Sequence, residues 1–170
     1  DLEAWDAVTL LLDTDPGAGT DSSSYRFVAQ FSDSGASAYH AAYRGGSAGW
    51  RPAAIPFSTK PGWRGESLND DGDDRGWVMG LRLPFSSLGL AGRPAAGTTW
   101  RMALVLHNRN AEAAAPLAAQ TWPPASDLER PATWGVLRLG LPPYQPPAAT
   151  NQRSVTIQHK LNGAVVPDAA

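Results

Sequence analysis

The stretch DRGWVMGLRLPFSSLG, residues 74–89, decides the fold class because it reads as a β-strand with a defined end. Alternation places one bulky apolar set on a single face of this strand: Trp77, Met79, Leu81 and Leu83. Pro84 cannot donate to a strand ladder, so it ends the strand, and residues 85–89 follow as a compact corner. We interpret the stretch as part of the structural scaffold of a β domain.

Other parts of the 170-residue chain repeat this pattern, and we expect strands at 5–13, 25–31, 37–44, 100–107 and 133–140. In residues 25–31 the aromatic residues alternate inward, whereas Arg26 and Gln30 point outward. Residues 45–76 and 108–132 read as long irregular loops, the second with a short helix near 111–119. Because 17 Gly, 15 Pro and 42% apolar residues accompany no long helical period, the sequence predicts an all-β antiparallel sandwich with jelly-roll or immunoglobulin-like layers.

Composition excludes several classes of function. A net charge of −2 without a basic cluster disfavours nucleic acid as a partner, and no apolar run is long enough for membrane insertion. The absence of cysteine excludes disulfides, thiolate metal sites and cysteine nucleophiles. The three histidines are scattered, all four glutamates fall outside the predicted strands, and no nucleophile elbow or phosphate loop is present. We therefore expect a protein that is not an enzyme.

The chain divides into three parts. Residues 1–146 form the predicted sandwich, 147–153 belong to a proline-rich linker, and 154–170 begin a second, truncated β domain with an Asn162-Gly163 turn signal. Asp1 is not a natural initiator, so we interpret the chain as a piece of a longer protein.

Six motifs in order carry a family resemblance: WDAVTLLLDTD, YRFVAQF, GWVMGLRLPFSSLGL, GTTWRMALVLHNRN, TWPP and PATWGVLRLG. Over residues 1–146 the chain resembles the carbohydrate-binding module family 9-like domains of the DOMON-like β-sandwich group. The strands that precede WDAV in that family are missing, which implies an N-terminally incomplete sandwich. The resemblance further implies non-catalytic binding of a polysaccharide or oligosaccharide through aromatic residues, often with structural calcium. It places the chain among other domains of a secreted or cell-surface protein of bacterial type.

Aromatic rings can stack on the flat faces of sugars, and loop tryptophans are the natural candidates for this role. We expect Trp50, Trp63 and Trp122 to line a shallow site with Asn108 and Arg109 of the HNRN motif, residues 107–110. The alternative is that each tryptophan pins its own loop to the sheet and that the HNRN residues cap loop backbone. Three other tryptophans sit in strand patterns and are assigned to the core or its margin: Trp77, Trp100 and Trp134.

Calcium could bind the acidic run NDDGDD through Asn69, Asp71 and Asp73, because hard cations prefer several converging oxygens. Asp13 and Asp15 are a second possibility, and a solvated acidic turn is the alternative for both sites.

Two other functions stay open at this stage. One is a structural or adhesive surface module without a sugar site. The other is a haem-binding DOMON domain, which would need methionine and histidine as axial ligands. Alternation puts Met102 and His107 on opposite faces of one strand, so this strand cannot supply both ligands, whereas His40 could pair with a methionine from another strand.

Overall fold

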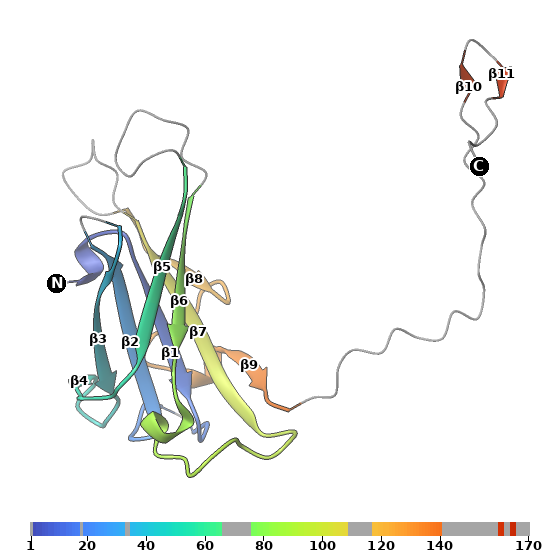
Figure 1. Ribbon diagram of the computed structural model, residues 1–170. Helices are drawn as coiled ribbons and strands as arrows, with labels where there is room; N and C mark the ends of the chain where they lie inside the picture. The colour runs from blue at the N-terminus through green and yellow to red at the C-terminus, as the bar shows by residue number, and fades with distance from the viewer. Residues whose placement is uncertain are drawn as a thin grey trace, which may run out of the picture.

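The computed structural model of the chain describes residues 2–17, 19–32, 35–65, 76–108 and 117–140, and the backbone at 160–161 and 164–165. Antiparallel strands dominate this part, and a two-stranded hairpin lies across one face of a larger sheet (Figure 1). The expected all-β, sandwich-like fold is therefore confirmed. No helix in the described residues is long and apolar enough to span a membrane.

The larger sheet has the strand order β4-β3-β2-β1-β7-β8, and β9 also pairs with β7. Its strands are β1 (Ala7–Asp13), β2 (Ser24–Phe31), β3 (Ala38–Arg44), β4 (Arg51–Pro52), β7 (Thr99–His107), β8 (Gln120–Trp122) and β9 (Gly135–Arg138). Every residue of β1 pairs with both β2 and β7, so β1 is the central strand. At one border of the sheet, the two residues of β4 pair only with Tyr43 and Arg44 of β3.

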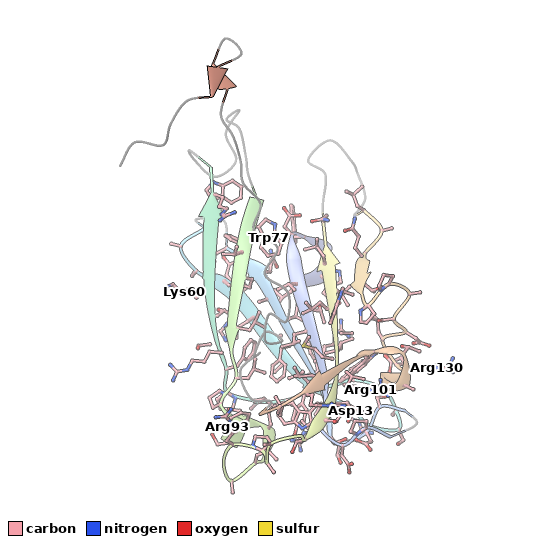
Figure 2. All side chains as sticks on the ribbon, turned by 90° about the vertical axis from the view of Figure 1, so that its right-hand side faces the viewer. Asp13, Lys60, Trp77, Arg93, Arg101 and Arg130 are labelled. Atoms are coloured by element: carbon pink, nitrogen blue, oxygen red, sulfur yellow. The ribbon has the colours of Figure 1, made fainter. Side chains whose placement is uncertain are left out.

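The quoted stretch forms half of the hairpin that covers this sheet. It contains β6 (Gly76–Arg82), which pairs with β5 (Ser58–Arg64), and then the short 3-10 helix η2 (Phe85–Leu88). Trp77 packs edge-on against Phe31 of the larger sheet, with ring centroids 5.3 Å apart. Lys60 lies exposed on the side of the hairpin that faces away from that sheet (Figure 2). The predicted alternation of β6 is thus present.

Each face of the larger sheet has its own core, because alternate side chains of the central strands are buried on opposite sides of the sheet. On the hairpin face, which β5 and β6 cover, the buried cluster is Leu12, Tyr25, Phe27, Ala42, Leu88 and Trp100. On the opposite face, here called the far face, the buried cluster is Leu11, Ala103, Val105 and Trp134. Trp100 and Trp134 are therefore core residues, as the sequence predicted.

Several predicted boundaries were wrong. Residues 45–76 are not uniformly irregular, since they contain β4 and β5. The first strand begins at Ala7 rather than at residue 5, and a 3-10 helix, η1 (Leu2–Ala4), precedes it and packs on β1 and β2. The last strand of the sheet is shorter than 133–140, because the 3-10 helix η3 (Pro131–Thr133) occupies its predicted start.

Parts of three predictions lie outside the described residues: the helix near 111–119 over 111–116, the linker at 147–153, and most of residues 154–170. Within the last segment, β10 (Lys160–Leu161) pairs antiparallel with β11 (Ala164–Val165). These two short strands flank the Asn162-Gly163 dipeptide.

Candidate functional site

The three tryptophans expected to share one site lie in separate places. Trp122 belongs to β8 and pairs with Leu104, which puts it on the hairpin face. Trp63 belongs to β5 and pairs with Trp77. Trp50 packs against the far-face cluster. The structure therefore does not bring them into one groove, and the expectation that Trp63 and Trp122 lie in loops was wrong, because Trp63 belongs to the seven-residue strand β5 and Trp122 to the three-residue strand β8.

Trp122 nevertheless stays accessible, with 52% of its surface exposed. Its indole lies over Gly135, where an added methyl group would sit 3.3 Å from the ring. The carbonyl oxygen of Asn108 accepts a hydrogen bond of 3.0 Å from the amide of Leu117, which closes the loop that follows β7. Arg109 lies outside the described residues.

The calcium candidates Asn69, Asp71 and Asp73 also lie outside the described residues. Asp13, the alternative candidate, is fully buried. Its carboxylate accepts hydrogen bonds from the hydroxyls of Ser23 and Ser24, at 3.0 and 3.2 Å, and from the amide of Asp15 at 3.0 Å. These donors tie the turn after β1 to the start of β2. Along the described ranges, the surroundings of Asp13 included, no three acidic or histidine side chains are grouped so as to hold a metal ion.

The residues considered for haem ligation are separated as alternation predicted. Met102 packs against the hairpin-face core. His107 hydrogen-bonds Thr9 on the far face. His40 packs edge-on against Phe57, with ring centroids 4.7 Å apart.

A different group of side chains gathers on the far face, over β2 and β3. Tyr39, Ala41 and Tyr43 are alternate residues of β3, and the register pairs Tyr39 with Gln30 and Tyr43 with Arg26. Tyr39 is 50% exposed, while the other four are partly buried. We call these five residues the tyrosine face. It presents two phenol rings in a row, each beside a planar polar side chain, with a small residue between them.

Trp50 lies beside β4, on the same side of the sheet as the tyrosine face. It lies two residues before Pro52, which pairs with Tyr43, so alternation places Trp50 on the same side of the sheet as Tyr43. The Nε1 atom of Trp50 is buried and has no hydrogen-bond partner among the described residues. Among the predicted sugar-binding residues that the structure describes, Trp50 lies on the same face of the sheet as the tyrosine face.

The electrostatics of this face centre on Arg26. Its guanidinium lies 5.3 Å from the centre of the Tyr43 ring and forms a close ion pair with Glu3 of η1. Glu3 also accepts a 2.6 Å hydrogen bond from the Thr9 hydroxyl, and His107 Nε2 lies 3.4 Å from the same carboxylate. Burial acts to raise the pKa of Glu3, but these hydrogen bonds and the charge of Arg26 outweigh it and hold the pKa at about 2.

Sequence reasoning missed the tyrosine face although its signal was present. The spacing Tyr39-x-x-x-Tyr43 puts both rings on one side of a strand, and Arg26-x-x-x-Gln30 has the same spacing on the partner strand. The outward orientation of Arg26 and Gln30 was predicted, whereas the two tyrosines opposite them were not singled out.

Comparison of the chain with protein-family models, with curated proteins and with solved structures returns no match. The described residues define the chain as an all-β, sandwich-like protein with an aromatic and polar patch on the far face of its larger sheet. Its function is therefore argued from these side chains.

Proposed function

We propose that the chain is a non-catalytic carbohydrate-binding module of a secreted or cell-surface multidomain protein. The observation that carries this proposal is the tyrosine face, where two aromatic rings stand on one side of a strand beside an amide and a guanidinium. The sequence resemblance to carbohydrate-binding module family 9-like domains supports the same function.

The chemistry of the tyrosine face suits a sugar chain. Phenol rings offer flat apolar surfaces to the C–H faces of sugars, while the planar groups of Gln30 and Arg26 supply hydrogen-bond donors to ring hydroxyls. Tyr43 lies four positions after Tyr39 along an extended strand, which places their Cα atoms roughly 13 Å apart. This distance exceeds the width of one sugar ring, so the expected ligand is an oligosaccharide or polysaccharide running along β3.

Affinity gel electrophoresis on gels containing neutral β-glucan, xylan or mannan tests the proposal. We expect at least one of these polymers to retard the protein, and Tyr39→Ala to weaken binding roughly tenfold, the loss typical of one aromatic stacking contact. Trp122→Ala is the matched control, because Trp122 is equally exposed but lies on the hairpin face. Loss of binding in Trp122→Ala with full binding in Tyr39→Ala would move the site to Trp122. Absence of retardation by every polymer would refute the function.

A further inference from the structure

The tyrosine face contains one cation, and that cation is already neutralised. The guanidinium of Arg26 is paired with the carboxylate of Glu3, and both side chains are only about one-fifth exposed, at 22% and 21%. Glu3 comes from η1, a segment that is separate from β2 and β3 and packs against β1 and β2. The ion pair therefore joins the N-terminal segment to the tyrosine face.

The surroundings keep Glu3 ionised. The Thr9 hydroxyl donates to one carboxylate oxygen, His107 Nε2 lies 3.4 Å from the same oxygen, and Arg26 binds the other oxygen. These contacts hold the pKa of Glu3 at about 2, so the carboxylate is charged at every ordinary pH. A negative charge thus stands permanently beside the only cation among the five residues of the tyrosine face.

We infer that the tyrosine face selects uncharged glycans over acidic ones, and that Glu3 sets this selectivity by occupying Arg26. The inference rests on the proposed function. A uronate or sulfate group on the ligand would have to displace the Glu3 carboxylate from Arg26, and it would be repelled by that carboxylate at short range. Neutral hydroxyls face no such repulsion, and they can hydrogen-bond the Gln30 amide.

Arg26 also connects Glu3 to the Tyr43 ring. Its guanidinium lies over the Tyr43 ring while it bonds to Glu3, so the ion pair holds the guanidinium in place against the ring. Glu3 is therefore a positioning residue for the proposed site and does not itself contact the sugar.

The experiment compares retention of the protein in gels that contain either a neutral β-glucan or the acidic polymer polygalacturonate, at low and high salt. We expect wild-type protein to bind the neutral polymer with little dependence on salt and to bind polygalacturonate more weakly. Glu3→Gln should bind polygalacturonate roughly tenfold more tightly than wild type does, because it removes the negative charge that competes with the ligand carboxylates for Arg26. That gain should disappear at high salt.

Glu129→Gln is the matched control, since it makes the same change in net charge at an exposed carboxylate, which accepts a 3.5 Å hydrogen bond from the Thr20 hydroxyl. It should bind like wild type. An equal gain in Glu129→Gln would assign the effect to net charge and overturn the inference, as would a folded Glu3→Gln protein that gains nothing.

The wild-type protein tests the inference even where Glu3→Gln does not fold. Stronger retention of wild type on polygalacturonate than on every neutral polymer would overturn the selectivity while leaving carbohydrate binding intact. Absence of retention on both kinds of polymer would instead refute the proposed function, and the selectivity with it.

Discussion

Replacing Glu3 by Gln should destabilise the fold in a pH-dependent way. The fall of the Glu3 pKa from its ordinary 4.5 to about 2 corresponds to about 3 kcal/mol of folding stability at pH 7, an upper figure because the side chain keeps some contact with water. Because the folded-state pKa is depressed, this contribution is complete above about pH 5 and is lost as the pH falls toward 2. About half of it should remain at pH 3.

Urea unfolding followed by tryptophan fluorescence measures this effect at intervals between pH 2 and pH 7. The free energy of unfolding of Glu3→Gln should lie about 2–3 kcal/mol below that of wild type at pH 7, and the two should converge near pH 2. Glu129→Gln, at an exposed position, should change stability by less than about 0.5 kcal/mol. A difference between Glu3→Gln and wild type that is the same at pH 3 and pH 7 would refute the reasoning.

Three further substitutions and one control, Gly17→Ala, probe the core, the turns and the buried carboxylate, each by urea unfolding at pH 7. Phe27→Ala should cost about 3–5 kcal/mol, because Phe27 is fully buried in the hairpin-face core. Gly45→Ala should cost more than about 1 kcal/mol, because its methyl group would lie 2.6 Å from the carbonyl oxygen of Asp21, whereas Gly17→Ala meets nothing within 4 Å and should be nearly neutral. Asp13→Asn should cost about 1–3 kcal/mol, since an amide nitrogen would replace an oxygen that accepts hydrogen bonds.

The strands that alternate clearly were predictable from sequence to within a residue or two. Residues 25–31 and 100–107 carry large apolar side chains at every second position, and the structure places β2 at Ser24–Phe31 and β7 at Thr99–His107. Burial of one side of a strand imposes this period of two, so the sequence records it directly.

The strand β5 was not predictable in the same way. Its sequence STKPGWR contains Pro61 and Gly62, which are rare in strand interiors, so the local pattern predicts a loop there. Among the described strands β5 pairs with β6 alone, so Pro61 sits in a strand whose other side has no paired neighbour in that part of the chain, where a missing amide hydrogen is tolerated.

The tyrosine face was missed for another reason. Alternation shows which residues point away from one core, but it does not show whether a second core covers them. Val28 and Tyr39 both lie on the far face, yet Val28 is almost fully buried and Tyr39 is half exposed. The difference depends on which segments pack over each strand, and that information is carried by tertiary contacts rather than by local pattern.

The two-residue strand β4 has a consequence for how copies of this protein behave when crowded together. Pro52 offers no amide hydrogen, and Arg51 adds a charge, so a neighbouring copy finds little there to extend the hydrogen-bonded ladder. Side-by-side self-association through this end of the sheet is therefore disfavoured.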